Sequence, residues 1–208
     1  MRRPWKRTKS YRRSVAQRTI RTRILIVCEG QKTEPNYFRK FPLDTEVVEL
    51  VVDGTGMSTL SLVDKAMELV DKASSQKCPY NQAWCVFDKD SFPLNLFNQA
   101  ILKARNNEIH VAYSNECFEL WYYLHFQFTD TAFHRSQYAH KLTREMNQKY
   151  VKNSPDMYDL LKNNQDDAIR NSKKLLNRYG KCIPARDNPS TTVHELVATL
   201  NSFIEDES

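Results

Sequence analysis

The feature that most constrains this 208-residue chain is a pair of short apolar runs that each end in acidic residues. The first run spans residues 24–28 and leads into Glu29. The second spans residues 83–87 and leads into Asp88 and Asp90. Runs of this length and composition, bounded by polar turns, predict buried strands. Because ligands bind at the carboxyl ends of strands in an open α/β sheet, these acids are predicted to lie at a binding edge.

The three acids suggest a site for a divalent cation. Neighbouring strands lie roughly 5 Å apart, so Glu29, Asp88 and Asp90 can converge on one ion if the two strands are adjacent. Without an ion, the acids would repel one another and resist ionisation. Mg²⁺ prefers a few carboxylate oxygens together with retained waters. The alternative is that the two aspartates only form an Asx-type turn.

Two further polar residues follow Glu29 closely. Glu34 lies in the first turn of a predicted helix that continues to residue 40, with Pro35 near its start. It is either a second metal ligand or an acid that is favourable at a helix N-terminus. Lys32 either balances phosphate charge or is an exposed lysine.

A fourth predicted strand, residues 109–113, leads to the same edge of the sheet. Ser114 and Asn115 after it are predicted caps of a helix through residues 117–126. Glu119 lies one turn beyond Asn115, where it either supports the metal site or orients a basic residue.

Two histidines follow in predicted helices. His125 recurs at helical spacing with apolar neighbours, which predicts a core or interface histidine. His194 lies in the first turns of the last predicted helix, where it can face the cleft. No Ser/His/Asp or Cys/His nucleophile system is indicated.

Strands and helices alternate up to about residue 128, which predicts a Rossmann-like, mainly parallel four-stranded sheet flanked by helices. The chain after residue 128 is predicted to be wholly helical. The predicted domains are a basic arm (1–23), an α/β domain (24–128) and a helical extension packed on or beside it (129–208). The predicted strands are residues 24–28, 46–52, 83–87 and 109–113, and the later helices are residues 137–151, 158–179 and 192–203.

The positive charge is concentrated at the N-terminus. Residues 1–23 carry ten Lys or Arg and no acid, which leaves 21 basic against 25 acidic residues and a net charge of −4 in the rest. Such an arm is predicted to be disordered and to contact nucleic acid through phosphates, with stacking by Trp5 and Tyr11. The alternative is a solubilising tail.

Several classes of protein are disfavoured by the sequence. No apolar run approaches the ~20 residues of a membrane span, and no apolar core follows the basic N-terminus as in a secretory signal. The five cysteines show no CxxC pair or metal-ligand spacing, which favours a reduced, cytoplasmic protein. With only four glycines, the phosphate-loop motif of ATPases is absent.

A strand ending in Glu-Gly followed by a strand ending in Asp-x-Asp is similar to the Toprim catalytic domain of topoisomerases, primases and OLD-type nucleases. The phrases VCEGQKTEPNYF, FDKDSF, AYSNECFELWYYLHF and NPSTTVHELV, in this order, resemble the RloB-like family. The resemblance runs from about residue 21 to residue 203. It implies a role in antiviral defence against phage and an AAA-type ATPase partner.

By this resemblance, Glu29 corresponds to the Toprim glutamate, and Asp88 and Asp90 correspond to its metal-binding aspartates. Glu34 corresponds to the second acid of OLD-type sites, and Gln31 stands where an acid is common. The expected function is therefore a Mg²⁺- or Mn²⁺-dependent nuclease, with Glu29 as ligand or general base. The alternative is a non-catalytic nucleic-acid-binding or regulatory subunit of a defence ATPase complex.

Overall fold

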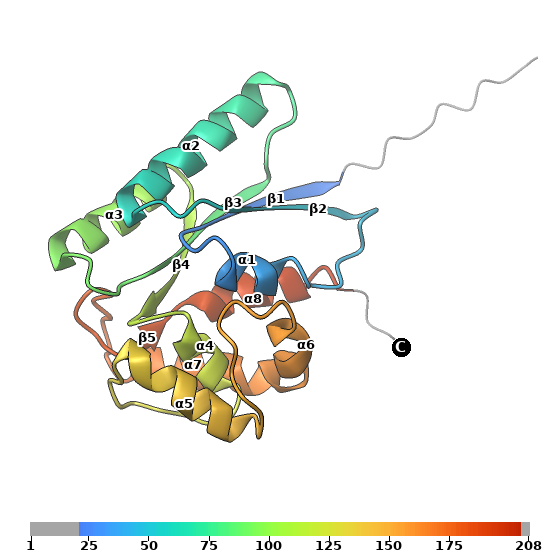
Figure 1. The fold of residues 1–208 in the computed structure, drawn as a ribbon. Coiled ribbons are helices and arrows are strands. Elements are labelled where there is room, and N and C mark those ends of the chain that lie inside the picture. The colour runs from blue at the N-terminus through green and yellow to red at the C-terminus, as the bar shows by residue number, and fades with distance from the viewer. Residues whose placement is uncertain (1–20, 205–208) are drawn as a thin grey trace, which may run out of the picture.

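A five-stranded sheet lies at the centre of the protein, whose computed structural model describes residues 21–204 (Figure 1). The strand order is β2-β1-β3-β4-β5, in which the first four strands are parallel and β5 is antiparallel to β4. The strands are β1 (Thr22–Cys28), β2 (Val48–Gly54), β3 (Gln82–Asp88), β4 (His110–Asn115) and β5 (Ser190–Thr191).

The prediction of four strands is wrong because β5 was missed. Its two residues are too few to show a period of two. The strand is held by tertiary contacts: the Thr192 N–H donates to the Tyr113 carbonyl at 3.0 Å, and the hydroxyls of Ser114 and Thr191 lie 3.1 Å apart. The chain after residue 128 is therefore not wholly helical.

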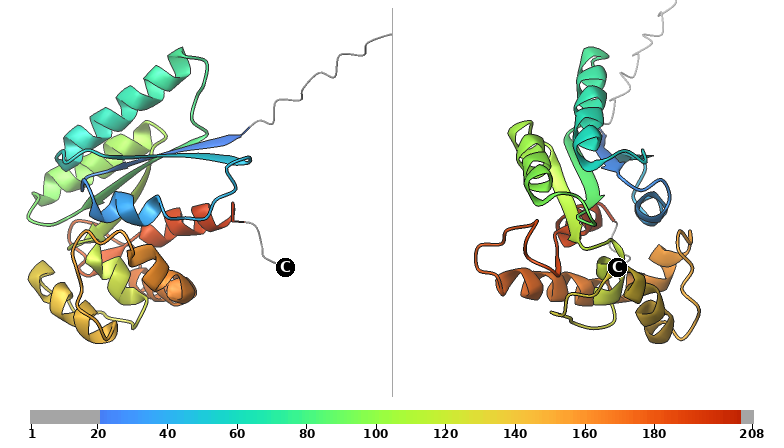
Figure 2. Two further views of the ribbon diagram at one scale, coloured as in Figure 1. Left: turned by 45° about the vertical axis from the view of Figure 1, so that its right-hand side comes forward. Right: turned by 60° about the vertical axis from the view of Figure 1, so that its left-hand side comes forward.

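Helices cover both faces of the sheet (Figures 1 and 2). Alternate residues of β1 point to opposite faces, so Leu25 and Val27 pack under one pair of helices while Ile24 and Ile26 face the other layer. The first layer consists of α2 (Thr59–Ser75) and α3 (Leu94–Asn106). Against the second face lie α1 (Thr33–Phe38), α4 (Glu119–Leu124), α7 (Gln165–Asn177) and α8 (Val193–Asn201).

The remaining helices lie at the end of the molecule farthest from α2, in yellow and orange in Figure 1. They are α5 (Arg135–Glu145) and α6 (Met157–Leu161), and α6 is joined to α7 by the 3₁₀ turn η1 (Lys162–Asn164). The single helix predicted for residues 158–179 is therefore divided. No helix among residues 21–204 has the length and apolar character needed to span a membrane.

Several predicted boundaries differ from the structure; β2, for example, spans Val48–Gly54 and not residues 46–52. β1 begins at Thr22, and Arg23, which was assigned to the arm, pairs with Glu49 at 2.9 Å. Residues 1–20 of the predicted arm lie outside the described residues. Ser114 and Asn115 are the last residues of β4 and not helix caps, because their backbones pair with β5.

The packing of α8 under the sheet can be tested with Leu196, which is fully buried. We expect Leu196→Ala to lower the free energy of unfolding by about 2–5 kcal/mol because it leaves a cavity in the core. Leu102→Ala is the control: Leu102 is 60% exposed on α3, so its loss should change stability by about 0.5 kcal/mol or less. Urea unfolding of both variants measures the difference, and equal effects would contradict the packing described.

Candidate active site

The site forms between β1 and β3, where the order of strands in the sheet reverses direction along the chain. β1 pairs in parallel with β3, while β2 lies on the other side of β1. In open sheets of this kind, ligands bind in the crevice at the carboxyl ends of the two strands that flank such a point. Glu29 directly follows β1 and Asp88 ends β3, so the predicted adjacency of the two acid-bearing strands is confirmed.

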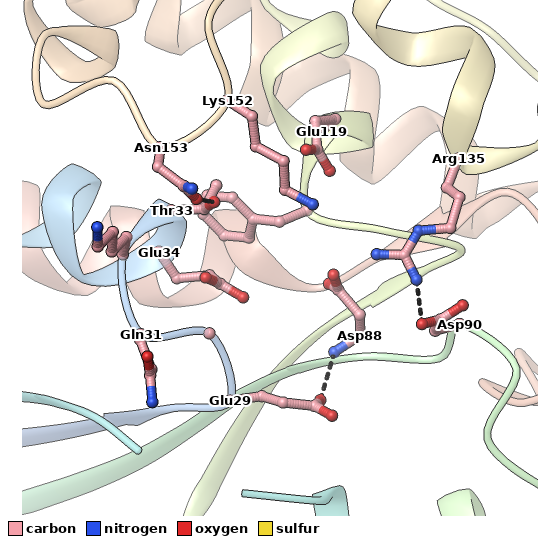
Figure 3. A pocket seen from close by; sticks show the side chains of 13 residues that line it. Glu29, Gln31, Thr33, Glu34, Asp88, Asp90, Glu119, Arg135, Lys152 and Asn153 are labelled. Atoms are coloured by element: carbon pink, nitrogen blue, oxygen red, sulfur yellow. Dashed lines mark hydrogen bonds and ion pairs between the residues drawn. The ribbon is translucent and has the colours of Figure 1, made fainter. Parts of the chain in front are cut away.

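A pocket of about 210 Å³ opens at this point. The residues that line it come from the ends of β1 and β3, from α1 and α4, and from the segment that contains α5 and the loop after it (Figure 3). The structure brings all six residues predicted from the sequence to this pocket: Glu29, Lys32, Glu34, Asp88, Asp90 and Glu119.

A hydrogen bond joins the two strand ends: the Asp88 backbone N–H donates to Glu29 Oε2 at 3.2 Å. Burial, with the neighbouring carboxylates of Glu34 and Asp90, raises the pKa of Glu29 from 4.5 to about 7, and the hydrogen bond from the Asp88 N–H acts in the opposite direction. The Asp88 side chain points away from Glu29, toward the middle of the pocket (Figure 3). Because its pKa is about 7, Glu29 can exchange a proton near neutral pH.

Glu34 and Asp88 lie in a strongly acidic environment. Burial raises the pKa of Glu34, and the carboxylate of Glu119 acts in the same direction. Burial also raises the pKa of Asp88 well above its usual range, and the carboxylates of Glu34 and Glu119 add to the effect. Gly30 makes room for this arrangement, because a Cβ at that position would lie 2.0 Å from Glu34 Oε2.

Asp90 differs from the other acids because it has a basic partner. Its carboxylate forms an ion pair with the Arg135 guanidinium at the start of α5 (Figure 3). Burial acts to raise its pKa, but the hydrogen bond and charge of Arg135 prevail and hold the pKa below its usual range. Asp90 therefore lies at the rim of the pocket as a charged, paired group.

Glu119 is held by a tyrosine from beyond α5. The Tyr150 O–H donates to Glu119 Oε1 at 3.1 Å, and both side chains are buried. Lys32, by contrast, is exposed at the N-terminal end of α1. Glu119 is thus fixed in the wall of the pocket, whereas Lys32 is free to reach a ligand at its mouth.

Three pocket residues were missed by the sequence reasoning: Arg135, Lys152 and Asn153. Asn153 has φ = +65°, a conformation that asparagine tolerates, and it accepts a hydrogen bond from Thr33 Oγ1 at 2.6 Å. This contact attaches the loop after α5 to α1. The Asn-Ser-Pro sequence there signals a turn, but no local pattern indicates that the turn reaches the sheet edge.

The two histidines lie outside the pocket lining. His125 is buried and its Nδ1–H donates to the Trp121 carbonyl at 2.9 Å, so the prediction of a core histidine is confirmed. His194 is also buried, and burial lowers its pKa to about 4.

The donor set matches the chemistry of a hard divalent cation. Glu29, Glu34, Asp88 and Glu119 supply oxygens only, and none forms an ion pair with a basic side chain among residues 21–204. In the same part of the chain, no three acidic, His or Cys side chains are already arranged to hold an ion. Binding would therefore require side-chain movement in the pocket.

A family model described as RloB-like protein matches residues 24–200, which is most of the chain. The chain belongs to the RloB-like family. The match includes every acid of the pocket and the segment that provides Arg135 and Lys152. No curated protein and no solved structure gives a significant match to this RloB-like chain.

The raised pKa of Glu29 predicts a pH-dependent loss of stability in the metal-free protein. Between pH 4.5 and about 7, folded Glu29 keeps a proton that the unfolded chain releases. Its contribution to stability is therefore present below pH 4.5 and is lost as the pH rises through 7. We expect Glu29→Gln, in EDTA, to be more stable than wild type at pH 8 and to lose this advantage at pH 4.5. Urea unfolding across this range measures it, and a constant difference would contradict the environment described for Glu29.

Proposed function

We propose that this RloB-like protein is a metal-dependent nuclease of the Toprim type that hydrolyses phosphodiester bonds. The observation that carries the proposal is the pocket at the β1/β3 switch point, in which Glu29, Glu34 and Asp88 have raised pKa values and form no ion pair within residues 21–204. Several acids held together at a loss of stability favour binding of a cation over a structural role.

Mg²⁺ or Mn²⁺ is the proposed cofactor, held by Glu29, Glu34 and Asp88, with Asp90 as a further ligand if it leaves Arg135. When bound, the ion supplies Lewis-acid stabilisation of the charge that develops on the phosphate. This role needs hard oxygen donors, which these four side chains provide.

The remaining steps fall to the protein's own side chains. Glu29 is either one of these ligands or, if the ion is held by the other acids, the general base that accepts a proton from the attacking water. Arg135 and Lys152 face the same pocket and can orient the phosphate. The hydrogen bond from Tyr150 holds Glu119 in the wall of the pocket. Lys32 offsets negative charge at the mouth of the pocket.

The proposed partners follow from charge and from the family. Residues 1–23, with ten basic residues and no acid, are proposed to contact the phosphates of RNA or DNA. An AAA-type ATPase partner, a role in antiviral defence and a cytoplasmic location remain expectations from the family resemblance.

Asp88→Asn tests the proposal because it keeps the side-chain size and removes a charge that an ion needs. We expect nuclease activity with Mg²⁺ or Mn²⁺ to fall by roughly 100-fold or more, as when a metal ligand is lost. The melting temperature without metal should stay the same or rise, because one of several mutually repelling carboxylates is removed. Cleavage and melting are measured on the same preparation, with and without EDTA and with and without the ATPase.

Asp71→Asn is the matched control, since Asp71 is exposed on α2 outside the pocket lining. It should retain wild-type activity and stability. Full activity in a folded Asp88→Asn protein, or no cleavage by wild type under any of these conditions, would favour the non-catalytic, regulatory-subunit alternative.

A further inference from the structure

One segment within residues 24–208 carries a net positive charge, although the rest of this range carries a net negative charge. Residues 134–152, which span α5 and the loop after it, contain five Lys or Arg and a single acid. The remainder of residues 24–208 contains 16 basic and 24 acidic residues. A concentration of positive charge beside an acidic pocket suggests a ligand that carries several negative charges. The five basic residues are Arg135, Lys141, Arg144, Lys149 and Lys152.

Two further pockets lead away from the active-site pocket along this segment. The first, which we name the flank pocket, has a volume of about 490 Å³ and shares Glu119, Arg135 and Lys152 with the active-site pocket. The second, the outer pocket, has a volume of about 560 Å³ and shares Ser136 with the flank pocket. Each of the three pockets therefore shares lining residues with the next, and Ser136 at the start of α5 lies between the flank and outer pockets.

Apart from Arg135, which pairs with Asp90, the basic groups along this series are available to a ligand. The Lys152 ammonium extends into the active-site pocket among the acidic side chains (Figure 3), yet it forms no ion pair within residues 21–204. Lys141 in the outer pocket has no carboxylate partner in that range either, and its ammonium lies 3.6 Å from the centre of the Phe133 ring. Among the same residues, Arg144 pairs only with Glu145, at 3.9 Å between Nε and Oε1.

We propose that the flank and outer pockets bind the phosphodiester backbone of one nucleic-acid strand whose scissile phosphate lies in the active-site pocket. Arg135 and Lys152, which line both pockets, hold the backbone where it passes from the active-site pocket into the flank pocket, and Lys141 and Arg144 hold a later phosphate in the outer pocket. This inference rests on the proposed nuclease function and names how its substrate is held. The tyrosines that line the two pockets, Tyr123 and Tyr150, are buried, so binding depends on phosphates and tolerates different base sequences.

The test compares the full-length wild type with the double variant Lys141→Gln/Lys152→Gln. Fluorescence anisotropy with labelled single-stranded RNA and DNA of mixed sequence, in EDTA, measures binding without cleavage. We expect roughly tenfold weaker binding at low salt and a plot of log affinity against log salt that is shallower by about 0.7 for each lost phosphate contact.

Lys174→Gln is the matched control, because the Lys174 ammonium also lies over a phenylalanine ring, 4.2 Å from the centre of Phe128, but on α7 away from the pocket series. It should bind like wild type. All proteins are checked for an unchanged melting temperature.

Wild-type affinity and salt dependence in the folded double variant would overturn the inference, as would the absence of any binding by wild type. The outcome is separate from that of the nuclease proposal. If wild type cleaves but the double variant binds normally, only this inference fails. If no metal supports cleavage but the double variant loses binding, the strand-binding surface stands and the nuclease proposal fails.

Discussion

The burial of several carboxylates at one sheet edge, where Glu29, Glu34 and Asp88 have no ion-pair partner in the described part of the chain, is the constraint on which the rest of the site depends. Glu34 and Glu119 are almost completely buried, and the pKa of Glu29 is raised to about 7. Such an arrangement weakens the metal-free fold near neutral pH, so its neighbours must hold it in place. The hydrogen bond from the Asp88 N–H to Glu29 and the close approach of Gly30 to Glu34 provide part of this support. A divalent cation would relieve the remaining repulsion.

Aromatic packing also holds the buried carboxylates in place, and it joins the two halves of the chain. The Tyr37 ring on α1 lies 5.9 Å from Phe118 and 5.6 Å from Tyr158, measured between ring centres. These contacts hold α1, with Glu34 in its first turn, against α4 and the later α6. The helices after residue 129 therefore help to position the acids. The same part of the chain supplies Arg135, on α5, and Lys152, in the loop after it, so the acidic centre and the basic segment beside it depend on the same packing.

The sequence was sufficient to predict the parts of the structure that local patterns encode. Buried parallel strands appear as short apolar runs, and the residues that follow them must meet at one edge, so Glu29 and Asp88 could be placed together before the structure was known. β5 could not be predicted, because two residues carry no periodicity and its position depends on pairing with Ser114 and Asn115. Arg135 and Lys152 were missed for a related reason: they look like ordinary surface residues, and only the tertiary fold, which places α5 and the loop that contains Asn153, brings them to the pocket.

The central claim, that the carboxylates at the ends of β1 and β3 bind a divalent cation, is tested most directly by a crystal structure of the protein grown with Mn²⁺. Anomalous scattering at a wavelength where Mn²⁺ scatters strongly locates the ion independently of the protein atoms. We expect an anomalous peak in the active-site pocket at coordinating distance from the Asp88 carboxylate and from at least one of Glu29 and Glu34. Well-ordered carboxylates with no anomalous peak between them at saturating Mn²⁺ would contradict it.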